Sequence, residues 1–217
     1  MTLRLVLASV SPRRRELLGL LGLPFEVVAS GFDEEALAPA GLTPAEYVTR
    51  LAAGKASEVV ARTDGDALVI GADTTVILDG ATLNKPADAA DARRMLRLLS
   101  GRTHQVYTGL CLIAVRGGVV GEVRTDHAVT DVTFDALSDE TIAAYVASGE
   151  PMDKAGAYGI QGKALSLIPG IRGDYFNVVG LPLELLRGLL LPYFPDIAPA
   201  PPQPSFPFPE YQEPKSE

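Results

Sequence analysis

The stretch Ala67-Leu68-Val69-Ile70-Gly71-Ala72-Asp73-Thr74-Thr75 decides which fold class this chain adopts. Its first six residues are apolar or small, which is typical of a strand buried on both faces. The apolar run ends at a carboxylate, Asp73. Ligand sites in open α/β sheets lie beyond the carboxyl ends of strands, so Asp73 is a candidate for holding a metal or orienting a water molecule. The alternative is an aspartate that only forms the turn before the next strand.

On both sides of this strand, apolar patterns and turn signals indicate further strands that alternate with helices. The expected strands are 3–8, 25–29, 67–72, 75–78, 81–83, 103–115, 119–134, 164–168 and 176–179. The expected helices begin near the caps Ser11, Thr43, Asp88, Ser138 and Pro182. Early strands alternate with helices, and a long hairpin lies in the middle of the chain. We therefore predict an α/β fold with a mixed sheet rather than a purely parallel one.

The length and the proline distribution indicate how the chain is divided. A chain of 217 residues is long enough for one domain, or a two-lobed domain, with a sizeable core. Nine of the 17 prolines lie in the last 26 residues. We expect residues 1–191 to form the folded domain and residues 192–217 to be a proline-rich tail, disordered or loosely docked.

Composition and charge exclude several classes of protein. The net charge of -8 argues against a nucleic-acid partner, but a local basic pocket still permits a small anionic ligand. The chain has no apolar run of the ~18–20 residues that a membrane span needs. Its start lacks the pattern of a signal peptide. A single cysteine, Cys111, excludes an internal disulfide. We expect a cytoplasmic protein without a membrane partner.

The segment Ser9-Val10-Ser11-Pro12-Arg13-Arg14 is a candidate phosphate site, because it joins an expected strand to an expected helix. The chain has neither a P-loop nor a dinucleotide-binding glycine pattern. A helix N-terminus offers free N–H groups and the positive end of a dipole, and the guanidinium groups add charge-assisted hydrogen bonds. The alternative is an ordinary helix cap with solvated arginines.

Three further charged residues are candidates for the same site. Lys55 lies on the apolar stripe of the expected helix 44–62, so it must extend to solvent, pair with a carboxylate or face a polar cavity. Lys85 follows the Asp79-Gly80 hairpin, and Glu34 lies in an acidic loop. Either residue taken alone is more typical of a solvated surface charge.

Several short segments together resemble the Maf family of nucleoside triphosphate pyrophosphatases. The resemblance covers residues 3–186 and becomes specific through the order and separation of the segments. These segments are 7–14 (LASVSPRR), 50–56 (RLAAGKA), 71–75 (GADTT), 85–86 (KP), 99–104 (LSGRTH) and 153–162 (DKAGAYGIQG). The last of them resembles the subgroup that acts on dTTP and UTP, and differs from the sister subgroup associated with 7-methyl-GTP.

The resemblance implies a fold and several residue roles. It implies an elongated mixed sheet flanked by helices with a cleft between two lobes, as in the inosine triphosphate pyrophosphatases. It implies that Asp73 is the proton acceptor and that Arg13, Thr74 and Gln161 govern substrate choice. It also implies that the basic residues converge on one cleft, and that a homodimer is an option.

These observations lead to a hypothesis about function: water attacks the α-phosphorus of a nucleoside triphosphate, with dTTP and UTP favoured, and pyrophosphate leaves. Asp73 and Glu34 would hold a divalent cation, Mg²⁺ or Mn²⁺. The phosphate groups would bind to Ser9, Ser11, Arg14, Lys55 and Lys85. Two alternatives stay open: a pyrophosphatase directed at purines or 7-methyl-GTP, and a non-catalytic nucleotide sensor that regulates septum formation.

Overall fold

The computed structural model describes residues 3–204 and contains one mixed sheet of seven strands. The strands are β1 (Arg4–Leu7), β2 (Phe25–Val27), β3 (Ala67–Leu78), β4 (Ala81–Leu83), β5 (Thr103–Arg116), β6 (Val119–Thr133) and β7 (Gly170–Arg172). Their order is β2-β1-β3-β5-β6-β7, and β4 pairs with β3. Strand β1 is parallel to β2 and β3, and the other pairs are antiparallel. The prediction of a mixed α/β sheet is confirmed.

Apart from α5, the helices described in residues 3–204 begin where the sequence predicts a helix start. The helices are α1 (Pro12–Gly19), α2 (Pro44–Val60), α3 (Ala89–Leu99), α4 (Asp139–Ala147), α5 (Tyr175–Val179) and α6 (Leu183–Leu190). The hydroxyl of Ser11 accepts a hydrogen bond from Arg14 N, and Thr43 forms a reciprocal capping box with Glu46. Such caps satisfy N–H groups that have no partner within the helix. Local sequence therefore determines where these helices start.

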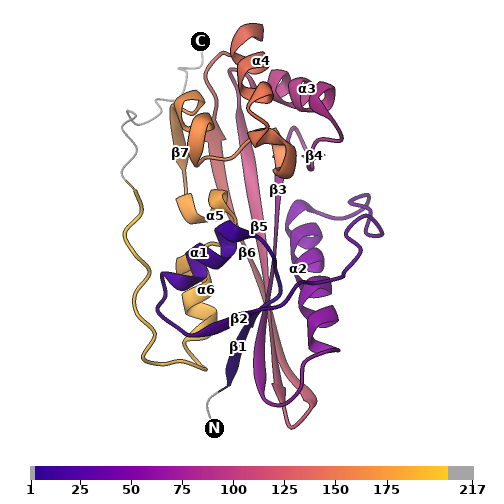
Figure 1. Ribbon diagram of the computed structural model, residues 1–217, viewed down its shortest axis with the longest axis vertical. Coiled ribbons are helices and arrows are strands. Elements are labelled where there is room, and N and C mark those ends of the chain that lie inside the picture. Colours follow the sequence, from indigo (N-terminus) through magenta and orange to yellow (C-terminus); the bar gives the residue numbers. More distant parts are fainter. Residues whose placement is uncertain (1–2, 205–217) are drawn as a thin grey trace.

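The sheet separates two apolar clusters. Helix α2 covers one face, where Ala52, Ala56 and Val59 pack against alternate residues of β1, β3 and β5. The larger cluster on the other face draws buried residues from α1, α3, α4, α5 and α6. In Figure 1 the long strands β3, β5 and β6 run the length of the molecule, with α3 and α4 near one end and α1, α2 and α6 towards the other. The fold is elongated, as expected.

The last third of the domain differs from the expected secondary structure. The predictions of strands at 164–168 and 176–179 are wrong, because these residues form a 3-10 helix, Gly162–Leu167, and helix α5. Asp174 caps α5 by accepting a hydrogen bond from Phe176 N at 2.7 Å. A short apolar run fits a buried helix as well as a buried strand, and periodicity does not separate the two. Two more 3-10 helices, Glu150–Asp153 and Ala155–Ala157, precede this region.

The first part of the proline-rich segment docks on the domain. Ile197 is only 5% exposed and belongs to the larger apolar cluster. Arg187 Nε of α6 donates a hydrogen bond to the carbonyl oxygen of Ala198 at 3.0 Å. For residues 192–204 the structure thus favours docking over disorder, while residues 205–217 lie outside the described part of the chain. None of the helices in residues 3–204 is long and apolar enough to cross a membrane.

Candidate active site

Strand β3 has an open edge in its middle, and this edge positions the site. Strand β1 pairs with residues 67–70 of β3, and β4 pairs with residues 76–78 on the same side. Within residues 3–204, no strand pairs with residues 71–75 on that side. Side chains from both faces of β3 therefore reach the same opening, which contains Asp73 and Thr74.

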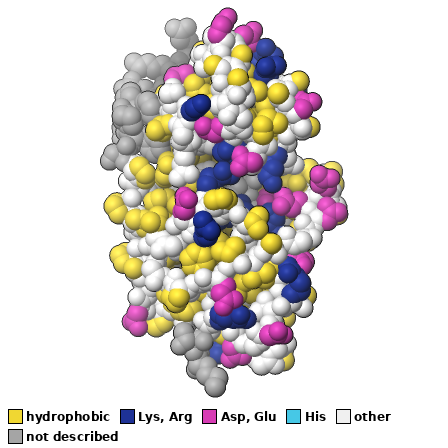
Figure 2. All heavy atoms as spheres, viewed as in Figure 1, with side chains coloured by type: hydrophobic (Ala, Val, Ile, Leu, Met, Phe, Trp, Pro, Cys, Tyr) yellow, Lys and Arg dark blue, Asp and Glu magenta, His cyan; other side chains and the backbone are white. Residues whose placement is uncertain are grey.

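A cavity of about 1260 Å³ lies at this opening. It is larger than the ~300–1000 Å³ typical of small-ligand sites, so it has room for a nucleotide. All ten residues nominated from the sequence line it: Ser9, Ser11, Arg13, Arg14, Glu34, Lys55, Asp73, Thr74, Lys85 and Gln161. Figure 2 shows Lys and Arg side chains, with acidic ones among them, at mid-height on this face of the molecule. The expected convergence of distant basic residues is thus present.

Two glycines allow helix α2 to lie very close to the sheet. A Cβ atom on Gly71 of β3 would be 2.1 Å from the carbonyl oxygen of Ala52, and one on Gly109 of β5 would be 2.4 Å from the carbonyl carbon of Val48. No ordinary side chain fits at either position. Because successive strand residues alternate between faces, Asp73 lies on the same face as Gly71, towards Lys55.

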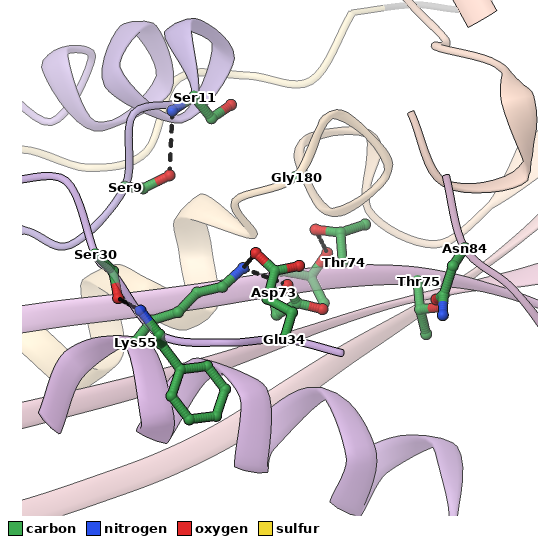
Figure 3. A network of polar contacts seen from close by, with 12 residues as sticks. Ser9, Ser11, Ser30, Glu34, Lys55, Asp73, Thr74, Thr75, Asn84 and Gly180 are labelled. Carbon is green, nitrogen blue, oxygen red and sulfur yellow. Dashed lines mark hydrogen bonds and ion pairs between the residues drawn. The ribbon is translucent and has the colours of Figure 1, made fainter. Parts of the chain in front are cut away.

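The Lys55 ammonium group is bound by two carboxylates. Its Nζ lies 2.6 Å from Asp73 Oδ1 and 2.9 Å from Glu34 Oε1 (Figure 3). The side chains of Lys55 and Asp73 are 10% and 9% exposed, whereas that of Glu34 is 44% exposed. Of the possible positions for a lysine on an apolar stripe, pairing with carboxylates in a polar cavity is the one found.

Burial gives the two carboxylates different pKa values. Loss of hydration raises the pKa of Asp73, and the nearby charges of Lys55 and Arg14 only partly oppose this effect. Burial also acts on Glu34, but its hydrogen bond and charge interaction with Lys55 outweigh it and lower the pKa of Glu34. Asp73 is therefore the stronger base of the two.

The N-terminus of α1 faces the cavity and orders the hydroxyl groups beside it. The Ser9 hydroxyl oxygen accepts hydrogen bonds from Ser11 N at 3.2 Å and from the Arg14 guanidinium at 3.5 Å. Arg14 also donates from Nε to the carbonyl oxygen of Gly180 at 2.9 Å and from Nη2 to Thr74 Oγ1 at 3.1 Å. Burial lowers the pKa of Arg14, against the charges of Asp73 and Glu34. This guanidinium remains charged at neutral pH.

Comparison with known proteins agrees with this geometry. Residues 4–192 match the family described as Maf-like protein. The chain belongs to the Maf family. It is 53% identical over 194 residues to a dTTP/UTP pyrophosphatase of Moorella thermoacetica, covering 89% of this chain and 97% of the relative. A dTTP/UTP pyrophosphatase of Symbiobacterium thermophilum is 56% identical over 181 residues, 83% of this chain and 89% of the relative. A dTTP/UTP pyrophosphatase of Thermococcus gammatolerans is 52% identical over 182 residues, which cover 84% of this chain and 92% of the relative.

In this Maf domain, the remaining nominated residues lie around the rim of the cavity. Arg13 Nη1 is 3.3 Å from Asp153 Oδ2, which joins the start of α1 to the loop 153–162. Lys85 and Gln161 are exposed and line the cavity. Figure 3 shows Asn84 beside Thr75, whose hydroxyl donates to Asn84 Oδ1 at 3.2 Å.

Several lining residues of the Maf domain were not given a role from the sequence. Asp153 and Lys154 form an ion pair at 2.5 Å, and the Lys154 ammonium also donates to the carbonyl oxygen of Glu150. Tyr158 lines the cavity and shares a 2.7 Å hydrogen bond with buried His104. Asp153, Lys154 and Tyr158 line the cavity and lie within segment 153–162. The glycine residues of this segment are the sequence signal that could have pointed to these three residues.

The two carboxylates suit an oxygen-coordinated cation that takes its other ligands from a substrate. Among residues 3–204, no group of three or more His, Cys, Asp and Glu side chains is arranged to hold a metal ion by itself. Asp73 and Glu34 nevertheless converge on one positive charge, the Lys55 ammonium. Mg²⁺ is commonly bound by one or two carboxylates plus substrate phosphates. The residues present therefore fit a divalent cation.

Proposed function

We propose that this Maf protein hydrolyses dTTP and UTP to the nucleoside monophosphate and pyrophosphate. Relatives that bear the name dTTP/UTP pyrophosphatase match more than four fifths of the chain. The structural observation that supports this most strongly is the buried pair of Lys55 and Asp73, with Glu34 beside it, in one cavity with Arg14. Such a site combines cations for a triphosphate with a carboxylate for a water molecule.

The ionised Asp73 carboxylate would accept a proton from water as the water oxygen bonds to the α-phosphorus. The bond from the α-phosphorus to the bridging oxygen breaks, and pyrophosphate leaves with that electron pair. The raised pKa of Asp73 suits this role, because general bases are most effective when their pKa approaches the working pH.

The leaving pyrophosphate carries several negative charges, so charge neutralisation and positioning dominate catalysis. Arg14, Lys55 and Lys85 supply positive charge, and Ser9 and Ser11 supply hydroxyl groups at the N-terminus of α1. Asp73 and Glu34 would hold a divalent cation, Mg²⁺ or Mn²⁺, which when bound neutralises charge on the phosphate oxygens.

Base selection is assigned to Arg13, Thr74 and Gln161, which line the same cavity. The amide of Gln161 has both donors and acceptors, and so suits the O4 and N3 edge of a pyrimidine. Arg13 is placed beside the same loop through Asp153.

The test is to incubate the purified full-length chain with Mg²⁺ or Mn²⁺ and, in parallel, dTTP, UTP, CTP, ITP and 7-methyl-GTP. We expect monophosphate and pyrophosphate from dTTP and UTP. In ¹⁸O-labelled water the label should enter the monophosphate, because the α-phosphorus is attacked. Label in pyrophosphate, or release of orthophosphate, would contradict the mechanism. Preference for ITP or 7-methyl-GTP would favour the purine alternative, and binding without turnover would favour the sensor.

A further inference from the structure

A chain of hydrogen bonds connects the Thr74 hydroxyl to the interior of the domain. Thr74 Oγ1 lies 2.9 Å from Thr108 Oγ1, on the directly paired residue of strand β5. Thr108 Oγ1 in turn lies 3.0 Å from the carbonyl oxygen of Asn177 in helix α5. Both Thr108 and Asn177 are 0% exposed. This chain lies on the face of β3 opposite to Asp73, so it is separate from the proposed base.

The position of α5 in this chain is fixed by the amide of Asn177. Its Nδ2 donates to the carbonyl oxygen of Val106 at 3.0 Å and to Thr130 Oγ1 at 2.9 Å. Thr130 Oγ1 also donates to the carbonyl oxygen of Asp174. Strands β5 and β6 thus hold both the start and the middle of α5. The carbonyl oxygen of Asn177 is therefore a stationary acceptor above Thr108.

This arrangement determines which way each hydroxyl proton points. A carbonyl oxygen only accepts, so the single proton of Thr108 must be directed at Asn177. Thr108 then has no proton for Thr74, and Thr74 must donate to Thr108. The reversed order would leave the buried carbonyl of Asn177 without this donor, which is unfavourable because a buried acceptor has lost its hydration.

The Thr74 hydroxyl oxygen is left with a single free lone pair. Its proton is directed at Thr108, and one lone pair accepts from Arg14 Nη2 at 3.1 Å. A hydroxyl oxygen has two lone pairs, so one remains for the cavity that Thr74 lines. Towards a ligand, this hydroxyl is an acceptor only.

We propose that Thr108 is a positioning residue that makes Thr74 an acceptor, and that Thr74 thereby selects bases with an N3–H donor. Uracil and thymine carry one proton on N3, which Thr74 would accept while the Gln161 amide donates to O4. Cytosine N3 is an acceptor and would face the oxygen lone pair. The inference rests on the proposed action on dTTP and UTP, and adds the reason why CTP is disfavoured. A buried hydrogen-bond network with fixed donor directions discriminates between nucleobases, because the wrong base leaves polar groups of the site without a partner.

The test compares kcat/KM for UTP and CTP in Thr108→Val and the unmodified protein. Valine keeps the shape of threonine but frees the Thr74 proton to rotate towards cytosine N3. We expect the CTP-to-UTP ratio of kcat/KM to rise roughly five- to tenfold, the scale of one hydrogen bond, with the change mainly in KM. Thr108→Ser retains the hydroxyl and should keep the original ratio.

Thr103→Val is the matched control. Thr103 lies on the same strand β5, and its hydroxyl also meets a threonine hydroxyl of a paired strand, Thr133 Oγ1 at 2.9 Å, but Thr103 does not line the cavity. Thr103→Val should leave the ratio unchanged. An unchanged ratio in Thr108→Val, or an equal rise in Thr103→Val, would overturn the proposal.

A second measurement needs no variant. N3-methyl-UTP lacks the N3 donor, and the unmodified protein should hydrolyse it at least about tenfold less efficiently than UTP. Equal use of the two nucleotides would refute the role of Thr74 even if Thr108→Val did not fold. If the unmodified protein released no pyrophosphate from UTP, the proposed function itself would fail, which is a distinguishable result.

Discussion

A β-carbon on Gly71 would lie 2.1 Å from the carbonyl oxygen of Ala52, so strand β3 and helix α2 meet there backbone to backbone. The contact matters for the site because α2 carries Lys55, and β3 carries Asp73 two residues after Gly71. Any side chain at position 71 must push the helix away from the strand. The spacing of the buried ion pair is therefore coupled to one glycine.

We predict that Gly71→Ala destabilises the protein by about 1–3 kcal/mol, the usual cost of overpacking a core. It should also lower turnover by up to about 100-fold, because a displacement of 1 Å is enough to disrupt catalytic geometry. Denaturant unfolding and pyrophosphate release measure the two effects. Gly188→Ala in α6 is the control, since its β-carbon would meet nothing within 4 Å. It should stabilise by about 0.5–1 kcal/mol. Full activity in Gly71→Ala would contradict the coupling.

Replacing the proposed base should abolish most activity without unfolding the protein. Asp73→Asn keeps the size of the side chain but removes the proton acceptor, and we expect turnover to fall by at least about 100-fold. The measurement is kcat with saturating dTTP, alongside circular dichroism. Asp79→Asn, in the hairpin that follows β3, is the matched control and should retain turnover, because Asp79 pairs with exposed Arg102 and does not line the cavity. Near-normal turnover in Asp73→Asn would remove Asp73 from the mechanism.

The pH dependence of activity should report on Asp73. Asp73 must be ionised to accept a proton from water, so kcat/KM falls as the pH drops through the pKa of Asp73. Burial raises this pKa above the ordinary carboxyl value. The Lys55 charge favours the ionised carboxylate and lowers this pKa. Its removal in Lys55→Met should therefore move the acid limb of residual activity to higher pH. Lys55→Arg, which keeps the charge, should shift the limb less. An acid limb at the same pH in all three proteins would count against this assignment.

His104 should make the protein lose stability in acid. Burial lowers its pKa to about 3, while the unfolded chain takes up this proton near the ordinary histidine pKa of about 6.5. Between these values the unfolded state binds more protons, so the free energy of unfolding decreases as the pH falls from about 6.5 to about 3. We expect His104→Gln to show a shallower slope in urea unfolding across this range. Equal slopes in His104→Gln and the unmodified protein would refute the prediction.

Much of the fold could be predicted from contacts between sequence neighbours. The caps at Ser11, Thr43 and Asp88 start helices where expected, because each satisfies an N–H group three residues away. The long hairpin of β5 and β6 follows from apolar runs on either side of Gly117-Gly118. The prediction was wrong at α5, where five residues carry too little periodicity to separate helix from strand.

The candidate site was only partly accessible from the sequence. Lys55 could be singled out because a lysine on an apolar stripe needs a partner, and Asp73 because it interrupts an apolar run. The prediction that the strand ends before Asp73 was wrong, because β3 continues through Asp73 to Leu78. Thr108 gave no such signal, since a threonine inside a strand is ordinary. Its role depends on a carbonyl oxygen 69 residues further along the chain.

The sequence by itself determined most of the strands and helices, the helix caps and the charged residues available for chemistry, because these depend on neighbouring residues and on residue type. The tertiary structure alone decided that residues 71–75 of β3 face an open edge, that Lys55 meets Asp73 and Glu34, and that the Thr74 hydroxyl meets that of Thr108. Those relationships depend on packing between segments far apart in the chain, where small displacements make or break a hydrogen bond.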